Sequence, residues 1–353
     1  LIGSELNELL GVIRTQELLA ARKIDGGEQY FTRANDFGFS KHSDETLEIW
    51  NKKEVLNDVV SVIRNLKPDV IINRFNHRNA GSTHGHHTAA AILSLEAFDL
   101  ASDKTYQTHL ENDVIWAPKR LFFNTSWWFY GSEENFEKAD KTNLLSLEIG
   151  TFYQSKGMSN NEIASLSRSQ HQSQGFGSTG NRGNQTEYLE FLKGDFPVNN
   201  NVFEGINTSW SRVEGAKNIE FILQKVEQNF DFKNPAKSIP DLLEAYKLMQ
   251  QLNDTHWKNI KIEEIKNIIA ACAGLYLEAV ADNSTTTKNS ENTIKIEAIN
   301  RSNTQIYLNA VNIPTLNITN SNKSHLINNK PYFTTLSVNI PGEIKETSPY
   351  WLT

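Results

Sequence analysis

Length, composition and charge set the first bounds on this chain. It has 353 residues, enough for two or three domains, and its formal net charge of −7 argues against a nucleic-acid-binding surface. Its single cysteine, Cys272, excludes an internal disulfide and a cysteine-based zinc site, and no apolar stretch is long enough to span a membrane.

The first predicted element is an amphipathic helix over residues 4–24. Apolar residues recur there at helical spacing, and Gly26-Gly27 ends the pattern. On spacing alone, Arg14 and Glu17 form a surface ion pair between residues three apart.

A loop and a second helix follow. Residues 28–46 are rich in loop formers, and Asp36 in this loop is either a turn residue or a functional carboxylate. Residues 51–67 repeat apolar side chains on one helical face and are predicted to form a helix that ends at Pro68.

The strongest chemical signal is a predicted strand, loop and helix between Pro68 and Leu100. The run Val70-Ile71-Ile72 is typical of a parallel strand covered on both faces, and the helix begins at the histidines, with Thr83 as its N-cap. His84, His86 and His87 therefore follow the carboxyl end of a strand, where open α/β sheets bind ligands.

These histidines are either solvated residues of a surface helix or metal ligands. Three histidines within four residues favour a metal site, but a catalytic zinc ion needs three protein ligands and an open position for water. This stretch supplies one or two ligands, so the others must come from elsewhere. His77 and His86 are further candidates near the site.

Aromatic residues follow the next predicted strand, residues 120–124. Trp127, Trp128, Phe129 and Tyr130 form either a platform for a sugar ring or the edge of a packed core. Further along, residues 143–156 and 161–173 suggest a strand and a helix. The glycine-rich run 175–183 lacks the pattern of a phosphate-binding loop and is predicted to be a lid or an interface loop.

Several of these stretches resemble the PIG-L/LmbE-like zinc N-deacetylases. The strand, loop and His84-x-x-His87 look like the family's His-Pro-Asp-His signature. Arg14 to Ala21 is similar to its Arg-x-x-Glu-x-x-x-Ala helix, Asp36-Phe37-Gly38 to its Asp-x-Gly, and Ala164 to Gln174 to its Ala…His-x-Ser-Gln helix. The resemblance covers residues 1–190 and keeps the family's order of motifs.

The resemblance implies a zinc-dependent hydrolase that removes an N-acetyl group from an N-acetylglucosamine-containing glycan or conjugate. It implies that His87 is a Zn²⁺ ligand, and that His84 supports the reacting carbonyl or the leaving amine. Arg14 and Asp36 would contact the substrate, and Trp127 is the residue that we expect to stack on the sugar. The implied fold is α/β, a Rossmann-like three-layer sandwich of the LmbE type.

The departures from the family pattern are also specific. The signature Ala-His-Pro-Asp-Asp-Glu, which supplies a His ligand, an Asp ligand and the Asp general base, is absent, and the sequence contains no His-Pro or Asp-Asp pair. We therefore expect the sequence to be a piece of a longer protein whose first strand precedes Leu1, and residues 1–353 alone to be inactive. Gly85 and His86 replace Pro and Asp, and Ser82 stands where some relatives carry a mobile Tyr. The alternative is a non-catalytic carbohydrate-binding protein with a degenerate deacetylase domain.

The remaining sequence changes in character twice. We expect a deacetylase domain over residues 1–210, a helical segment over 211–284 with helices at 214–229, 239–252 and 257–281, and the start of an immunoglobulin-like β domain over 285–353. The expected partner is an amino-sugar or glycan substrate, with no nucleic acid and no membrane span. Homo-oligomerisation and a periplasmic or secreted location are left open.

Overall fold

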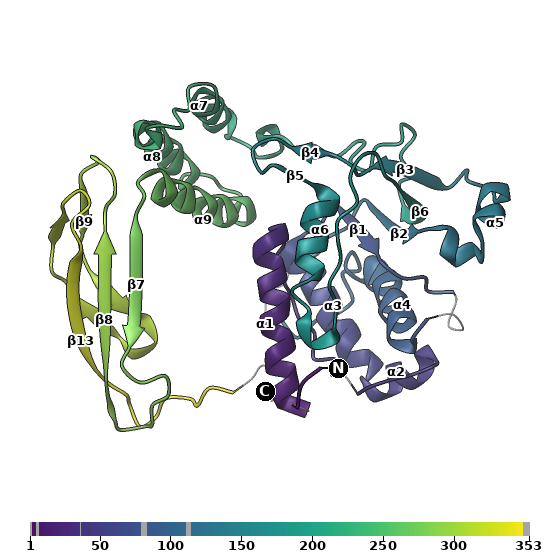
Figure 1. Cartoon of the computed structure of the whole chain (residues 1–353), viewed down its shortest axis with the longest axis horizontal. Helices are drawn as coiled ribbons and strands as arrows, with labels where there is room; N and C mark the ends of the chain where they lie inside the picture. Colours follow the sequence, from purple (N-terminus) through teal and green to yellow (C-terminus); the bar gives the residue numbers. More distant parts are fainter. Residues whose placement is uncertain (1, 5–6, 36, 79–82, 111–113, 349–353) are drawn as a thin grey trace. The chain divides into compact units, whose positions relative to one another are not determined.

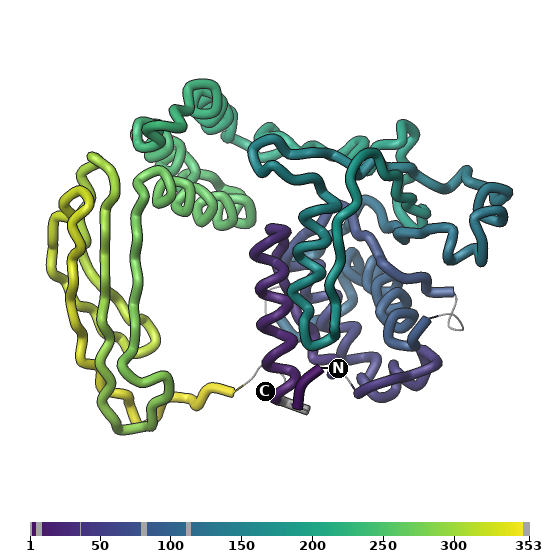
Figure 2. The backbone as a smooth tube through the Cα atoms, in the orientation of Figure 1, coloured from purple at the N-terminus to yellow at the C-terminus, as the bar shows by residue number. Residues whose placement is uncertain are grey.

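The computed structural model describes residues 2–4, 7–35, 37–78, 83–110 and 114–348 of the chain. The chain divides into two compact units, Leu1–Ile206 with Ser348–Thr353, and Asn207–Thr347 (Figure 1, Figure 2). Each unit has its own sheet and hydrophobic core, so the two are described separately.

The first unit is built on a four-stranded sheet with the order β1-β2-β6-β3. Strand β1 (Val70–Asn73) runs parallel to β2 (Arg120–Thr125), as the sequence predicted. Strand β6 (Thr186–Gly194) runs antiparallel to both β2 and β3 (Leu144–Glu148). The sheet is therefore mixed, and only β1 and β2 form the parallel pair at whose carboxyl ends a ligand crevice is expected.

Helices and short segments complete this unit. They are α1 (Asn7–Asp25), α2 (Ser43–Ile49), α3 (Lys52–Leu66), α4 (Gly85–Leu100), η1 (Trp127–Tyr130), α5 (Glu133–Lys138), β4 (Phe152–Tyr153), β5 (Met158–Ser159), α6 (Asn160–Arg168) and η2 (Gln172–Gln174). Helices α1 and α6 pack side by side (Figure 1). The helices expected over residues 4–24 and 51–67 are confirmed as α1 and α3.

The two faces of the sheet pack against different cores. Ile71 joins the cluster formed by α2, α3 and α4, whereas Val70 and Phe122 face the opposite side, with Leu145. Side chains alternate along a strand, so Asn73 lies on the same face as Ile71, beneath α4. The expectation that β1 is covered on both faces is wrong for Ile72, which is 51% exposed.

A buried arginine fixes the carboxyl end of α4. Arg64, on α3, is only 2% exposed. It donates hydrogen bonds to the carbonyl oxygens of Leu100, Ala101, Asp103 and Tyr106 at 2.7–3.1 Å. The last carbonyls of a helix have no partner within the helix. Arg64 supplies that partner and so joins α3 to the end of α4.

The amino end of α4 differs from the prediction. His84, not Thr83, is the N-cap residue, and no side chain caps the helix there. The loop of residues 40–42 crosses this end, with Gly85 N donating to Ser40 O at 2.8 Å. A Cβ at Gly85 would lie 2.4 Å from both His42 O and Ser40 Oγ, so the close approach requires glycine where the family signature has proline.

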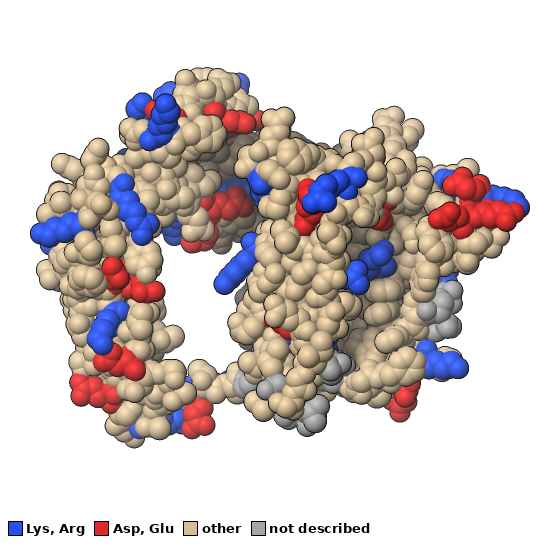
Figure 3. Space-filling view, in the orientation of Figure 1, with Lys and Arg blue, Asp and Glu red and all other residues tan. Residues whose placement is uncertain are grey.

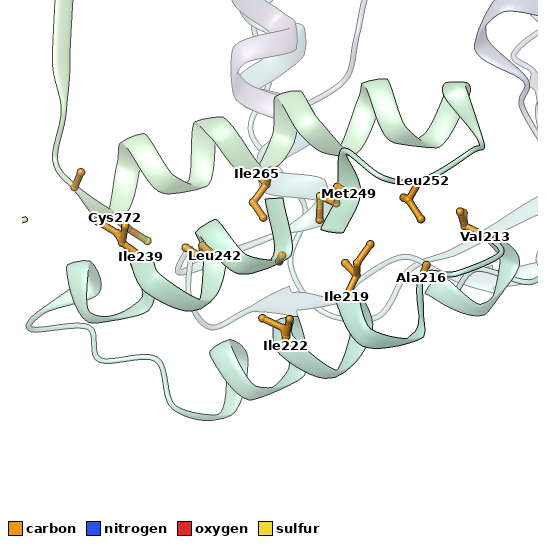
Figure 4. Close-up of a cluster of buried hydrophobic side chains, with 12 residues drawn as sticks. Val213, Ala216, Ile219, Ile222, Ile239, Leu242, Met249, Leu252, Ile265 and Cys272 are labelled. Atoms are coloured by element: carbon orange, nitrogen blue, oxygen red, sulfur yellow. The ribbon is translucent and has the colours of Figure 1, made fainter. Parts of the chain in front are cut away.

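The second unit begins with three helices, α7 (Lys217–Gln228), α8 (Ile239–Met249) and α9 (Thr255–Cys272), with the short helices η3 (Trp210–Arg212) and η4 (Pro235–Ser238). Their facing apolar side chains, among them Ile219, Leu242, Met249 and Ile265, form one buried cluster (Figure 4). Cys272 lies in this cluster and burial raises the pKa of its thiol, as expected for a structural cysteine.

An antiparallel sheet of order β13-β8-β7 follows the helices. It contains β7 (Tyr276–Ala281), β8 (Glu291–Ile299) and β13 (Tyr332–Asn339). The pairs β9 (Ile306–Leu308) with β12 (Ser324–Leu326), and β10 (Val311–Ile313) with β11 (Ile318–Asn320), lie beside it, and η5 (Pro314–Leu316) connects β10 to β11.

The helix expected over residues 257–281 is wrong in its last part. Helix α9 ends at Cys272, and Gly274 then adopts a φ of +56° that reverses the chain. Tyr276–Ala281 pairs with β8 instead. The boundary predicted between residues 284 and 285 lies in the turn between these two strands.

The structure bears out an α/β fold in the first unit, while the more specific LmbE-type topology stays a prediction.

Acidic and basic side chains are interspersed over the face shown in Figure 3. On α5 and just beyond it they form ion pairs with one another, Lys138 with Glu134 and Lys141 with Glu137. Within the described part of the chain, no helix combines the length and apolar character of a membrane span.

Candidate functional site

The candidate site lies at the carboxyl ends of β1 and β2. Helix α4 follows β1, and η1 follows β2 directly. Because β1 and β2 are parallel neighbours, the histidines at the start of α4 and the aromatic residues of η1 belong to the same edge of the sheet.

His84 and His87 form one column of rings with two phenylalanines. The imidazole of His87 stacks on the ring of Phe75 with centroids 3.7 Å apart and planes at 13°, and His84 lies parallel to His87 at 5.3 Å. Phe39 meets His84 edge-on at 4.9 Å. The predicted shared face of the two histidines is therefore observed, and flat contacts limit rotation of the His87 ring.

His86 points to different neighbours. Its ring lies 4.5 Å from that of Phe37 and 5.5 Å from that of Trp50, and its Nδ1 is 3.4 Å from Ser40 Oγ. These contacts hold the loop before α2 against the start of α4. Through Phe37, the Asp36-Phe37-Gly38 stretch reaches the histidine helix, whereas Asp36 itself lies outside the described residues.

Burial lowers the pKa of two imidazoles of this region. It lowers the pKa of His87, and positive charge on His84 or His86 would lower that pKa further. Burial also lowers the pKa of His77, with Arg78 adding to the effect and Glu190 opposing it. A neutral imidazole has one nitrogen with a free lone pair, which a ligand or base requires.

Several buried polar atoms near the histidines lack partners. Asn73 Nδ2, His77 Nδ1 and His87 Nδ1 are all buried, and no hydrogen-bond partner for them exists among the residues that the structure describes. Buried polar groups are almost always paired with protein or water, so each such atom needs an explanation. Their gathering at the end of β1 is typical of a site that binds a ligand.

An ion-pair network that sequence reasoning missed lies under this edge. Glu190 on β6 is 7% exposed, and Arg78 Nη2 donates to its two carboxylate oxygens at 2.7 and 2.8 Å. Burial and the charge of Glu190 both raise the pKa of Tyr130, on η1. The available signal was a glutamate inside an otherwise apolar strand, Leu189-Glu190-Phe191.

A second polar link joins the neighbouring strands. Arg74 Nη1 donates to Asn124 Oδ1 at 2.7 Å, and Asn124 Nδ2 donates to Glu187 Oε2 at 2.8 Å. Together with the Arg78–Glu190 pair, this link connects the loop after β1 to β2 and β6.

The helix carrying Arg14 meets the late motif of the chain. Arg14 is half-buried on α1. Glu17, one turn further, accepts hydrogen bonds from Ser173 N at 2.6 Å and Ser173 Oγ at 2.7 Å. The Arg-x-x-Glu and His-x-Ser-Gln stretches, 156 positions apart, are thus in direct contact. The contact of Arg14 with substrate stays a prediction.

The two tryptophans of the aromatic segment are exposed rather than buried. Trp127 and Trp128 are 46% and 47% exposed, so they do not form the edge of a packed core. Phe129 anchors the segment by an edge contact with Phe123 at 4.7 Å, and Trp128 rests on Phe129 at 4.8 Å. About half of each tryptophan is therefore accessible, and the role of Trp127 in substrate binding stays a prediction.

The glycine-rich loop packs on α6. Arg182 pairs with Glu162 at 2.8 Å, the guanidinium of Arg168 lies 4.8 Å from the Phe176 ring, and Ser178 N donates to Ser169 Oγ at 3.3 Å. These contacts hold the loop on α6, and both roles expected for residues 175–183, a lid or an interface loop, stay predictions.

The described residues do not fit a complete zinc site. Among them, no group of three or more His, Cys, Asp or Glu side chains is arranged to hold a metal ion. A catalytic zinc ion takes three protein ligands. The column of His84 and His87 supplies imidazole nitrogens but no carboxylate, so any metal held by His87 needs ligands from outside the described residues.

Comparison with known proteins adds one finding. Residues 3–98 match the family model PIG-L, described as GlcNAc-PI de-N-acetylase. This segment is PIG-L-like. The matched PIG-L residues include α1, the Asp36-Phe37-Gly38 stretch and the histidine column, which confirms the resemblance inferred from those motifs. No curated protein and no solved structure matches the chain.

The PIG-L match covers residues 3–98, less than half of the chain. The network around Glu190, the β7–β8 pair and the helical unit lie beyond the match.

Proposed function

We propose that this chain forms part of a zinc-dependent N-deacetylase that removes an N-acetyl group from an N-acetylglucosamine-containing glycan or conjugate. The observation that supports this best is the column of Phe75, His87 and His84 at the carboxyl end of β1, within the PIG-L-like segment. Two oriented imidazoles at a ligand crevice suit amide hydrolysis, which must both stabilise a carbonyl oxyanion and protonate a leaving amine.

His84 is the residue suited to proton transfer. It is exposed at the first position before α4, and its ring is held by His87 on one side and by the edge of Phe39 on another. An exposed but oriented imidazole can donate a hydrogen bond or a proton to a bound substrate. We assign it to the leaving amine or to the tetrahedral oxyanion.

His87 is the residue suited to ligation. It is more buried than His84, and burial favours its neutral form. The resemblance assigns it a Zn²⁺ ion, which would activate a water molecule and polarise the amide carbonyl. The remaining ligands and the carboxylate base belong to the signature that this sequence lacks. Residues 1–353 alone are therefore proposed to be inactive.

Three further residues are proposed to contact the substrate. Trp127, which is exposed, is proposed to stack on a sugar ring, and Arg14 and Asp36 are proposed to bind its hydroxyl or carbonyl groups. The exposed Trp127 and Trp128 also support the second candidate, a carbohydrate-binding protein without catalysis.

Acetate release separates the two candidates. The substrate is N-acetylglucosamine or its β-linked dimer. The proteins compared are residues 1–353 and the full-length product of the gene. We expect no acetate from residues 1–353 and zinc-dependent release from a full-length product that carries the Ala-His-Pro-Asp-Asp-Glu signature. Sugar binding without acetate release by either form would favour the carbohydrate-binding protein.

A further inference from the structure

The guanidinium of Arg78, in the loop between β1 and His84, is held by the protein at two of its three nitrogens. Its Nη2 donates to both carboxylate oxygens of Glu190 at 2.7 and 2.8 Å, and its Nε donates to Asn76 Oδ1 at 3.2 Å. A guanidinium has five N–H groups, and these bonds use three of them. The two N–H groups of Nη1 have no partner among the described residues, and the side chain is 50% exposed.

The position of Glu190 in the sheet shows where this arginine lies. Glu190 on β6 pairs with Phe123 on β2, and Phe123 pairs with Asn73 on β1, so the three residues form one row across the sheet. Asn73 is the last residue of β1, and Phe123 is close to the end of β2. The Arg78–Glu190 pair therefore lies at the carboxyl ends of the two parallel strands, where the ligand crevice is expected.

The pair also lies close to the aromatic segment. Burial raises the pKa of Tyr130, Glu190 raises it further, and Arg78 lowers it. Such effects of individual charges require the groups to be near one another. Tyr130 belongs to η1, which begins at Trp127. Arg78 is thus in the loop that leads to His84 and near the segment that carries Trp127, the two parts of the proposed substrate site.

The charges around Arg78 favour an uncharged ligand. Glu190 balances the charge of Arg78, and Lys193, whose charge also acts on this region, pairs with Asp99. Clefts that attract anions carry an excess of positive charge, which these pairs do not leave. An N-acetylglucosamine unit offers uncharged acceptors, namely its hydroxyl oxygens and the carbonyl oxygen of its acetamido group.

We propose that Arg78 is a substrate-binding residue, whose Nη1 donates to a hydroxyl or acetamido oxygen of the N-acetylglucosamine unit, and that Glu190 is the residue that positions it. The guanidinium is oriented before the sugar binds, so little side-chain freedom is lost on binding. The inference rests on the proposed function only in taking an N-acetylglucosamine unit as the ligand. It adds a contribution from β6, which lies beyond the PIG-L match.

Sugar affinity tests the proposal without requiring catalysis. The measurement is the dissociation constant of the β-linked N-acetylglucosamine dimer, by titration calorimetry on residues 1–353. Arg78→Lys keeps the charge but removes Nη1, and should raise this constant about tenfold, the ratio that one hydrogen bond to a charged group sustains. The matched control is Arg74→Lys in the same loop. Arg74 Nη1 already donates to Asn124 Oδ1, so this change should leave the affinity for the dimer unaltered.

A double-mutant cycle tests the role of Glu190. Glu190→Gln should weaken binding of the dimer when Arg78 is present. It should have little further effect in Arg78→Lys, because Glu190 acts through Arg78. Equal weakening in both backgrounds would show that Glu190 supports the fold in general and does not position Arg78.

Three results would overturn the proposal. They are unchanged affinity in Arg78→Lys, no binding of the dimer by the wild type, and tighter binding of a phosphorylated N-acetylglucosamine than of the uncharged sugar. If Arg78→Lys does not fold, the guanidinium nitrogen signals of Arg78 in the wild type decide by nuclear magnetic resonance. They should shift when the dimer is added, and unshifted signals would refute the contact. Acetate release is measured separately, so failure of the proposed function is distinguishable from failure of this contact.

Discussion

At the scale of single residues, the three clustered histidines have different surroundings and so different expected roles. His84 is exposed at the crevice, whereas His86 packs between Phe37 and Trp50. Sequence spacing alone does not distinguish the roles of neighbouring histidines, whereas the side chains packed around each of them do. His84 and His87 could be singled out from the sequence because their i,i+3 spacing places them on one helical face.

His84 gives the first prediction. In the protein that releases acetate, His84→Ala should lower kcat by about 10²–10³, the usual effect of losing one oxyanion or acid group. The matched control is His86→Ala, which removes packing and should lower thermal stability more than turnover. Equal turnover for His84→Ala and wild type, measured as acetate release with zinc retained, would show that His84 is only structural.

Arg64 gives a second prediction at this scale. Replacing it by Met removes hydrogen bonds to four carbonyl oxygens and should lower the free energy of unfolding by about 3 kcal/mol. Arg33 is the control, because this arginine is itself exposed where it pairs with Glu54 and Asp58, and it should contribute less than about 1 kcal/mol. Urea unfolding that gave similar losses for Arg64→Met and Arg33→Ala would contradict this role for Arg64.

At the scale of elements, the strand-loop-helix and the first helices could be predicted from periodicity, because each has a continuous apolar pattern and a clear terminator. The segment after residue 257 could not. Apolar residues continue from α9 into β7 with little change in composition, and the turn at Gly274 is a single residue. Sheet pairing with β8 decides the outcome, and that pairing is not local in sequence.

The joint between α1 and η2 is testable by a double-mutant cycle. Glu17 accepts two hydrogen bonds from Ser173, so Glu17→Gln and Ser173→Ala should each lower stability by about 1–2 kcal/mol. The double variant should lose less than the sum, with a coupling of about 1 kcal/mol in urea unfolding. Additive losses would mean that these two residues do not stabilise one another.

Asp25, the last residue of α1, should make the stability of the fold depend on pH. Hydrogen bonding to Arg22 lowers the pKa of Asp25 to about 2, with Gly27 N and Ser167 Oγ also donating to this carboxylate. Because the folded pKa lies below the ordinary value of 3.8, the stabilisation is complete above about pH 4 and is lost as the pH falls toward 2. In Asp25→Asn, the free energy of unfolding should change less with pH in that interval than in the wild type. An unchanged dependence on pH would show that Asp25 does not stabilise the fold in this way.

At the scale of the whole molecule, the change of composition near residue 210 marks a real change of structure, since the second compact unit starts at Asn207. Its core is formed by helices α7, α8 and α9, with their own apolar faces. We predict that residues 207–347 expressed alone unfold cooperatively in urea, because they contain a complete buried cluster. A non-cooperative, gradual transition would show that this unit depends on the rest of the chain.

From the sequence, only those residues of the candidate site that belong to a recognisable motif could be predicted. Residues 3–98 contain the histidine column and match the PIG-L model, so the sequence was sufficient there. The Arg78–Glu190 pair joins residues 112 positions apart and belongs to none of those motifs. Such groups become visible only when strands are paired and burial is known.

His87 is the residue on which the proposed function depends most, and its metal occupancy is the most direct test. The measurement is zinc per chain, by mass spectrometry, in the full-length product of the gene. We expect about one zinc ion in the wild type and in His86→Ala, and loss of most of it in His87→Ala, because affinity comes from several ligands held together. Residues 1–353 alone should hold zinc only weakly. Full zinc occupancy in His87→Ala would contradict the assignment of His87 as a ligand and, with it, the zinc-dependent deacetylase proposed for this chain.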